Sequence, residues 1–302
     1  MWASNLKKSI NNQTYKPKKA KKFLLCERGK VREIYPVHIS DRVVQKLFND
    51  KILKPITYPH LIYHNGASRI GKGTDFQLNE FKKHLRKHIN KYGNNGYILF
   101  IDFSNYFGNI DKEILIKKLN LPIEDIILFK KLTDCSDGLT LGSEANQICA
   151  IFYPSNIDHY IKEQLKIKCY GRYMDDMYLI HNDIKYLEYC KNKILKECDK
   201  LNIIVNPKKI KIIKLTDQFT FLKKQFKITN TGKILMRPVR KNYKLRRKCL
   251  VNYKKLYDSN IMSLSQVENS YKIWKGFAIK NGSPQYIINN MDKYYNNLFK
   301  ED

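Results

Sequence analysis

Zinc-ligand patterns are missing from this sequence, although it contains seven cysteines. No two of them form a Cys-x-x-Cys pair and no histidine lies at zinc spacing from them, which excludes the usual structural zinc sites. The scattered positions instead predict small core residues that stay reduced in the cytoplasm: Cys26, Cys135, Cys149, Cys169, Cys190, Cys198 and Cys249.

Long apolar segments are also missing. The N-terminus has no apolar signal-peptide core, and no run approaches the length of a membrane span. These absences predict a soluble, cytoplasmic protein without a membrane partner. No repeat or low-complexity linker interrupts the 302 residues, which suffice for one large unit or for two or three subdomains.

Acidic residues are scarce. The chain has 28 Asp and Glu against 57 Lys and Arg, and the resulting charge of +29 is spread along its whole length. Since 43% of the residues are hydrophobic, we expect a folded protein, and nucleic acid is the partner that best explains the charge. A membrane surface fits less well, because neither end carries a basic amphipathic helix with Trp or Leu on its other face. A generally lysine-rich composition would raise the charge without a functional cause, so the motifs must decide.

The most informative stretch is residues 170–180, Tyr-Gly-Arg-Tyr-Met-Asp-Asp-Met-Tyr-Leu-Ile. Asp175 and Asp176 interrupt a run of residues that favour a half-buried strand. The conflict eases if both lie at the tip of a hairpin, where Asp tolerates turn geometry and its carboxylate points into solvent or onto a cation. An ordinary hairpin with an acidic turn is the alternative. A third carboxylate, a nucleotide pocket and a nucleic-acid track elsewhere in the chain would argue against it.

A second acidic residue of interest ends an apolar run. Residues 97–102 read as a buried strand that delivers the carboxylate of Asp102 at its end, which is a rigid way to hold a catalytic group. Other local patterns follow from periodicity and turn residues: a helix from His38 that Pro55 stops, a glycine-rich loop at 64–76, helices after Asp111 and Pro122, a loop at 138–142 before a helix near Ser143, a helix at 183–201, an Asn-Pro-Lys-Lys turn at 206–209, and a single alternating strand at 219–228.

Both ends of the chain are basic. Residues 15–23 are too polar for a core and read either as an extended arm that contacts phosphate or as a solvated tail. The C-terminal segment reads as helices, and the first of them is strongly basic, with Arg237, Arg240, Lys241, Lys244, Arg246, Arg247 and Lys248.

The order of these pieces carries a resemblance. A strand ending in Asp102, a Gly-x-x-x-Gly loop entering a helix, the Tyr-Met-Asp-Asp hairpin, the Asn-Pro-Lys-Lys turn and Phe221-Leu-Lys223 resemble the motifs of the reverse transcriptase family, from about Arg32 to the end. The resemblance implies an α+β fold, a right-hand polymerase with fingers, an RRM-like palm of antiparallel sheet and helices, and a helical thumb. It implies a basic N-terminal arm at 1–32, fingers at 33–95, a palm at 96–232 and a thumb at 233–302.

The resemblance also implies the catalytic groups. Nucleotidyl transfer uses two metal ions about 4 Å apart, and Mg²⁺ takes hard oxygen ligands. Asp102 and Asp175 would bridge two Mg²⁺ ions, for which Mn²⁺ can substitute, with Asp176 as a supporting ligand and the Phe103 carbonyl facing the triphosphate. Lys209 matches the lysine that protonates the leaving pyrophosphate, although a solvated basic turn explains it nearly as well.

Further residues match binding positions of the family. The nucleotide-binding set is Arg69, Lys72, Phe107, Leu141, Gly142 and Gln147, in which Arg69 and Lys72 clasp the triphosphate and Phe107 excludes a 2′-OH. The primer and template set is Phe221, Leu222 and Lys223, which depart from the commoner Phe-Leu-Gly, with Arg237, Arg240, Lys244 and Arg247 along duplex phosphates. For Phe107 a core position beside Tyr106 is the alternative.

One departure points to a branch of the family. Many members carry Pro-Gln-Gly where this chain has Thr140-Leu-Gly142, and the Leu141 and Gln147 pattern is similar to diversity-generating retroelements and their bacterial defence relatives. We therefore expect RNA-directed DNA synthesis on a structured non-coding RNA, with a DNA primer, dNTPs, relaxed fidelity, and an accessory protein or a second copy as further partners. The alternatives are an untemplated or protein-primed DNA polymerase of a defence system and a catalytically silent RNA-binding protein of the same fold.

Overall fold

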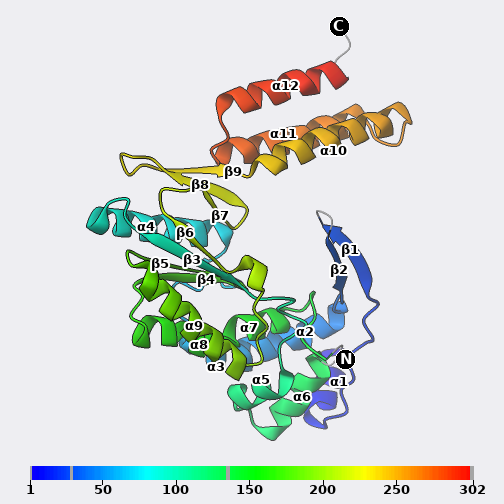
Figure 1. Cartoon of the computed structure of the whole chain (residues 1–302). Coiled ribbons are helices and arrows are strands. Elements are labelled where there is room, and N and C mark those ends of the chain that lie inside the picture. Colours follow the sequence, from blue (N-terminus) through cyan, green and yellow to red (C-terminus); the bar gives the residue numbers. More distant parts are fainter. Residues whose placement is uncertain (1, 28–29, 134–136, 300–302) are drawn as a thin grey trace. The chain divides into compact units, whose positions relative to one another are not determined.

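A computed structural model describes residues 2–27, 30–133 and 137–299 (Figure 1). Cys135 lies outside these ranges. The chain divides into two compact units: the first contains Met1–Tyr92 and Gly96–Ile212, and the second contains Gly93–Asn95 and Ile213–Asp302. No helix within the described ranges is both long enough and apolar enough to cross a membrane.

The first unit combines a four-stranded sheet, a two-stranded hairpin and most of the helices. Its strands are β1 (Phe23–Glu27), β2 (Lys30–Ile34), β3 (Tyr97–Asp102), β4 (Cys169–Tyr173), β5 (Asp176–His181) and β6 (Lys211–Lys214), which runs across the boundary between the units. Its helices are α1 (Trp2–Asn11), α2 (Ile39–Phe48), α3 (Lys54–Thr57), α4 (Thr74–Tyr92), α5 (Lys112–Leu119), α6 (Ile123–Thr133), α7 (Glu144–Phe152), α8 (Ser155–His159) and α9 (Ile184–Lys200), with short π or 3₁₀ turns η1 (Asn49–Leu53), η2 (Tyr58–His60), η3 (Tyr160–Gln164) and η4 (Pro207–Lys209).

The four-stranded sheet has the order β4-β5-β3-β6, and β5 is antiparallel to both β3 and β4. Because successive side chains of a strand point to opposite faces, Leu99 and Ile101 join the core that contains α7 and α9. On the other face Tyr178 packs edge-on against Phe81 of α4, with ring centroids 4.5 Å apart. Figure 1 shows α4 on one side of this sheet and α7, α8 and α9 on the other. Both faces are covered, so β3 and β5 are almost continuously apolar apart from Asp102 and Asp176 at their paired ends.

The helix expected from His38 does not stop at Pro55. It passes through the η1 turn and continues as α3, and Pro55 lies in the first turn of α3, directly after the π turn. The N-cap of α2 is His38, whose side chain accepts from the Ser40 N–H. Asp41 is buried and accepts from the Tyr15 hydroxyl at 2.7 Å and the Lys18 N–H at 2.9 Å. Part of the basic N-terminal segment is therefore fixed to the core.

The second unit contains a three-stranded antiparallel sheet and three helices. They are β7 (Phe219–Phe221), β8 (Lys224–Ile228), β9 (Ile234–Pro238), α10 (Arg240–Asp258), α11 (Leu264–Lys280) and α12 (Gln285–Phe299). The helices share a core that includes Leu250 of α10, Tyr271 of α11 and Tyr295 of α12. The rings of Tyr271 and Tyr295 stack at 4.3 Å.

Three sequence predictions about these elements are wrong. Residues 219–228 form two strands rather than one, because Leu222 and Lys223 make a turn with positive φ angles of 45° and 63°. Arg237 lies on β9 and not on the basic helix. Of the cysteines in the described ranges, Cys26 and Cys249 are exposed, whereas Cys149, Cys169, Cys190 and Cys198 are buried as expected. The expected class, an α+β fold with antiparallel sheets and helices, is confirmed.

Candidate active site

The ends of β3 and β5 bring the acidic residues of both motifs together. Asp102 and Asp176 are directly paired in the β3–β5 register, and Tyr173 pairs with Asp176 across the β4–β5 hairpin. Met174 and Asp175 therefore form a two-residue turn, in which Met174 has a φ of +54°. The Phe103 N–H donates to the Asp175 carbonyl at 3.3 Å, which ties the turn to the end of β3.

A buried arginine, Arg172, stabilises this turn through hydrogen bonds. The Arg172 guanidinium donates to both carboxylate oxygens of Asp158 at 2.8 and 2.6 Å, and both side chains are fully buried. A further N–H of Arg172 donates to the carbonyl of Met174 at 2.9 Å, and another donates to the Ile151 carbonyl at 2.8 Å. The turn that carries Asp175 is thus linked to α7 and α8 through one side chain.

The segment after α9 brings a cation to the carboxylates. The Ser104 N–H donates to Ile204 O at 2.7 Å, and the Asn206 N–H donates to Asp102 O at 2.9 Å. This pairing places the η4 turn beside β3, where Lys209 Nζ lies 2.5 Å from Asp102 Oδ1. The predicted catalytic set of Asp102, Asp175, Asp176 and Lys209 is therefore gathered in one place.

The carboxylates repel one another in a partly buried site. Burial and the charge of Asp102 raise the pKa of Asp175, while Lys209 and Arg32 oppose the shift. Burial and the charges of Asp175 and Asp102 raise the pKa of Asp176 above its usual range, and a hydrogen bond with Asp102 acts in the same direction. For Lys209, partial burial lowers the pKa, but the hydrogen bond and charge of Asp102 outweigh it and the net shift is upward.

A cavity of about 800 Å³ opens onto this group. Asp102, Phe103, Asp175 and Lys209 line it, while Asp176 does not. Val31, Arg32, Glu33 and Tyr35, from β2 and just after it, form another wall, which sequence reasoning missed. The available signal was the strand-like pattern on both sides of Gly29, which is typical of a hairpin. The positive charge of Arg32 lowers the pKa of Asp175, and we therefore add Arg32 to the candidate site.

Phe107 and Leu141, from the predicted nucleotide set, also line the cavity. Leu141 is bridged to Ile34 in parallel, and its carbonyl accepts from the Tyr35 N–H at 2.9 Å. The next residue, Gly142, has a φ of +118°, and a Cβ there would lie 2.4 Å from the Tyr35 carbonyl oxygen. Glycine is required here by both the backbone conformation and the close approach of β2.

We expect Gly142→Ala to separate the Leu141 wall from β2. Strain of this kind costs about 1–3 kcal/mol, so the urea midpoint of the first unit should fall and the KM for dNTPs should rise. Gly73→Ala is the matched control, because a Cβ at Gly73 meets nothing within 4 Å. Equal stability and KM of the two variants would contradict the role assigned to this contact.

The other predicted nucleotide-binding residues lie elsewhere. Arg69 donates to the carbonyls of Ile62 and Asn65 at 3.2 and 3.5 Å, and Lys72 donates to the Tyr63 carbonyl. Gln147 accepts from Ser68 Oγ at 3.2 Å. None of the three lines the 800 Å³ cavity, so the structure does not bring them to the carboxylates.

The predicted primer and template residues are in the second unit. Phe221 is buried in β7, and Leu222 and Lys223 form the turn to β8. Arg237, Arg240, Lys244 and Arg247 gather around one cavity of about 430 Å³ together with Tyr243 and Tyr286. Four cations beside the exposed Tyr286 ring and the half-buried Tyr243 ring form a surface that suits phosphates and bases.

The donors of the first unit suit a hard divalent cation. Carboxylates and a backbone carbonyl are the oxygen ligands that Mg²⁺ prefers, and a cation would relieve the repulsion that raises the pKa values of Asp175 and Asp176. Within the described ranges no three or more His, Cys, Asp or Glu side chains are grouped so as to hold a metal ion, and Lys209 contacts Asp102. The fit to Mg²⁺ rests on the type of the oxygen donors and not on such a grouping.

Comparisons with known proteins agree with the site. The profile of the reverse transcriptase (RNA-dependent DNA polymerase) family matches residues 16–226, more than half of the 302 residues. This chain belongs to the reverse transcriptase family. The resemblance inferred from its motifs is confirmed, and Asp102, the hairpin and η4 all lie within the matched reverse transcriptase region. None of the curated proteins compared with the chain matches it.

Solved structures of telomerase share the fold of this reverse transcriptase. The telomerase of Candida albicans in complex with the TWJ fragment of telomeric RNA matches with a TM-score of 0.56 at 13% identity. The match covers 97% of this chain and 56% of the telomerase chain. The C-terminally truncated apo telomerase of Candida tropicalis matches with a TM-score of 0.52 at 14% identity. This match covers 78% of this chain and 59% of the telomerase chain. The chain thus spans a little over half the length of these telomerases, and the expected polymerase fold is confirmed.

Proposed function

We propose that this chain is an RNA-directed DNA polymerase that adds deoxynucleotides to a primer 3′-OH. The observation that carries the proposal is the shared cavity of Asp102, Asp175 and Lys209, at the place where two strands of the family's domain end. Within this proposal the fingers comprise 33–95, the palm 96–232 and the thumb 233–302.

The proposal assigns Mg²⁺ to the carboxylates. Asp102, Asp175 and the Phe103 carbonyl would hold two ions, with Asp176 in support through its hydrogen bond with Asp102. When bound, the ions supply charge neutralisation at the attacking and leaving oxygens of an in-line phosphoryl transfer. Lys209 holds a proton beside Asp102 that it can give to the leaving pyrophosphate. Phe107 and Leu141 line the same cavity, where the sugar and base of the nucleotide would lie.

The experiment is primer extension by the purified full chain. Labelled dNTPs are supplied with Mg²⁺ and an RNA template annealed to a DNA primer, with reactions that lack the template or the primer in parallel. We expect product that is complementary to the template and that needs the primer. Product without template would favour an untemplated or protein-primed polymerase, and no product in any reaction would favour a silent RNA-binding protein.

We predict that Lys209→Met lowers the rate of extension by about 10²- to 10⁴-fold, which is the usual contribution of a general acid. Lys209→Arg keeps the charge beside Asp102 but cannot release a proton, because the pKa of arginine exceeds 12. The Arg variant should therefore remain slow in single-turnover kinetics, while both variants keep the wild-type urea midpoint. A fully active Lys209→Arg would restrict Lys209 to an electrostatic role.

We further propose a bacterial setting, either a retroelement or an antiphage defence system with a dedicated structured RNA. The support is the pair Leu141 and Gln147 in place of the commoner motif residues.

If Leu141 relaxes fidelity, Leu141→Gln should lower misincorporation about fivefold, as one added hydrogen bond is worth about 1 kcal/mol. Sequencing the products made on one template measures this, and equal error rates would exclude Leu141 as the cause. RNA that co-purifies with the protein would identify the template.

A further inference from the structure

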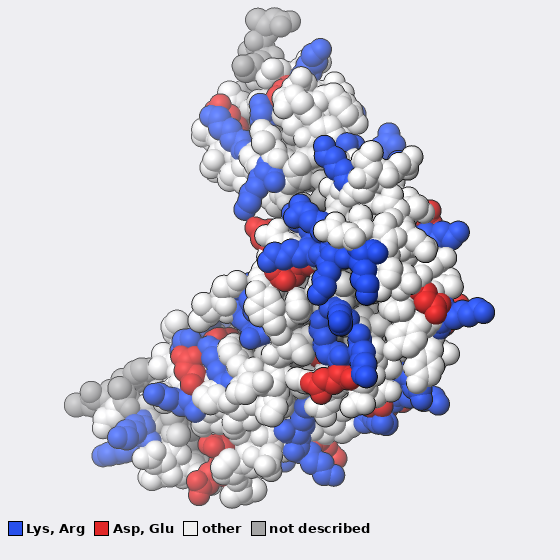
Figure 2. Space-filling view, turned by 90° about the vertical axis from the view of Figure 1, so that its left-hand side faces the viewer, with Lys and Arg blue, Asp and Glu red and all other residues white. Residues whose placement is uncertain are grey.

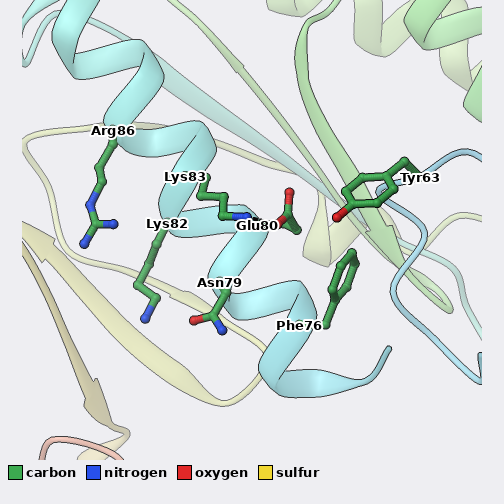
Figure 3. Close-up of a pocket in the computed structure, with 7 residues that line it drawn as sticks. All are labelled: Tyr63, Phe76, Asn79, Glu80, Lys82, Lys83 and Arg86. Atoms are coloured by element: carbon green, nitrogen blue, oxygen red, sulfur yellow. Dashed lines mark hydrogen bonds and ion pairs between the residues drawn. The ribbon is translucent and has the colours of Figure 1, made fainter. Parts of the chain in front are cut away.

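A third cavity, of about 310 Å³, lies on the outer side of α4 and shares no lining residue with the carboxylate cavity. We name its surroundings the α4 patch: Tyr63, Phe76, Asn79, Lys82, Lys83 and Arg86. Figure 3 shows Asn79, Lys82 and Arg86 extending from one side of the helix, with Phe76 and Tyr63 together near its start. Figure 2 views the molecule from the side where α4 lies in Figure 1, and Lys and Arg side chains crowd the middle of that face.

The opposite side of α4 fixes the helix in place. Leu78, Phe81 and Leu85 are buried, and His84 hydrogen-bonds with the Tyr178 hydroxyl of β5 at 2.9 Å. A helix rises 1.5 Å per residue, so Phe76 and Arg86 lie about 15 Å apart along a rigid axis. The patch is therefore a preformed row rather than a set of independent side chains.

The α4 patch has an excess of positive charge. The one carboxylate that lines this cavity, that of Glu80, is buried and lies 2.7 Å from Lys83, which compensates its charge, and 3.4 Å from His64. Burial and the nearby Lys162 lower the pKa of His64 to about 4, which leaves that ring neutral. Within the described part of the chain, Lys82 and Arg86 have no ion-pair partner, so both remain available to an anion.

Two aromatic rings, those of Tyr63 and Phe76, lie at one end of the α4 patch. Tyr63 is 60% exposed, and its ring meets Phe76 edge-on with centroids 5.5 Å apart. Lys72 Nζ lies 4.5 Å from the Tyr63 centroid and 4.7 Å from that of Phe76, which braces the pair. An exposed, braced ring offers a face on which a base can stack.

Other ligands match this combination less well. A membrane surface would need a broad apolar face, which one exposed ring does not provide. An acidic protein would use the cations but not the tyrosine face. A nucleic acid duplex would meet the cations with its phosphates, but its stacked bases could not reach Tyr63.

We propose that the α4 patch binds single-stranded nucleic acid outside the catalytic cavity, with a base on Tyr63 and phosphates along Lys82, Lys83 and Arg86. This second site extends the proposed function and does not require catalysis. It gives the protein a means to hold an unpaired region of the nucleic acid on which it acts.

The test measures binding without catalysis. Fluorescent 15-nucleotide oligouridylate and oligodeoxythymidylate, and a blunt duplex, are titrated with the full chain in EDTA at several salt concentrations. We expect Lys82→Glu/Arg86→Glu to weaken single-strand binding at least tenfold and to reduce the salt slope by about 1.4, because each phosphate contact to a single strand contributes about 0.7. The tighter of the two strands tells whether RNA or DNA is the preferred ligand.

The matched control is Lys185→Glu/Lys196→Glu, which makes the same charge change at exposed positions of α9. It should weaken binding less than threefold, and equal losses in the two double variants would overturn the proposal. Tyr63→Ala should weaken single-strand binding at least fivefold and leave the blunt duplex unchanged; the same loss with both ligands would also overturn it. Primer extension by the wild type is measured separately, so a failure of the proposed polymerase activity would not be mistaken for a failure of this site.

Discussion

Asp175→Asn is expected to lower primer extension at least about a thousandfold while leaving the fold intact. The substitution keeps the size of the side chain in the two-residue turn but removes the charge that faces the cavity. Stabilisation of the transition state by a bound cation is worth several kcal/mol, and each 1.36 kcal/mol is tenfold in rate. Removing one carboxylate also lowers the repulsion that raises the pKa of Asp176, so stability should not fall.

The measurement is single-turnover extension on an RNA template, with the urea midpoint measured in parallel. Asp199→Asn, an exposed position on α9, makes the same chemical change away from the site and should extend at the wild-type rate. A variant at Asp175 that retained more than a tenth of the activity would refute the assignment of this carboxylate.

Loss of Arg172 should be the largest effect on stability. Arg172→Met leaves Asp158 charged and fully buried without its bidentate partner, and breaking a buried pair typically costs about 3–5 kcal/mol. The Met174 carbonyl loses its donor at the same time, so the turn that carries Asp175 is less well held. A displacement of 1 Å in a catalytic group can cost about a hundredfold in rate.

A double variant separates the two effects. Arg172→Met/Asp158→Asn removes both charges and keeps an acceptor for the Tyr170 hydroxyl, which now donates to Asp158. Most of the urea midpoint should return, while extension remains about a hundredfold slower because Met174 still lacks its donor. Lys185→Met, at an exposed position, is the control and should leave both the urea midpoint and the extension rate unchanged. If the double variant regained full activity, Arg172 would act only through stability and would not position the turn.

Local patterns predicted the acidic part of the site well. The strand before Asp102 and the hairpin around Asp175 are both signalled within a few residues, by apolar runs and by acid at their ends. By contrast, the β2 wall depends on the bridge from Ile34 to Leu141, a contact between distant parts of the chain that leaves no local pattern. Loop composition also could not show that Arg69 donates to carbonyls of the preceding segment, those of Ile62 and Asn65.

The error at 219–228 has a geometric cause. Phe219 and Phe226 face each other as partners, so the two-residue turn shifts the alternation by one residue: the buried positions are 219 and 221 before it and 224, 226 and 228 after it. This short shift was read as part of one strand. The usual marker of such a turn is Gly or Asn at positive φ, whereas here Leu222 and Lys223 adopt it. Secondary structure was therefore predicted correctly as strand, but its topology was not.

The distances in sequence across the carboxylate cavity have a consequence for biosynthesis. Its lining residues run from Val31 to Lys209, which are 178 positions apart (209 − 31). At about 5–20 residues per second, a ribosome needs roughly 10 to 35 seconds to make that stretch, and until it ends the edge of β3 that pairs with β6 stays open. The nascent chain must therefore protect a nearly complete but unfinished sheet during synthesis. A chaperone that binds exposed strands would be expected to recognise nascent chains that end between β5 and η4.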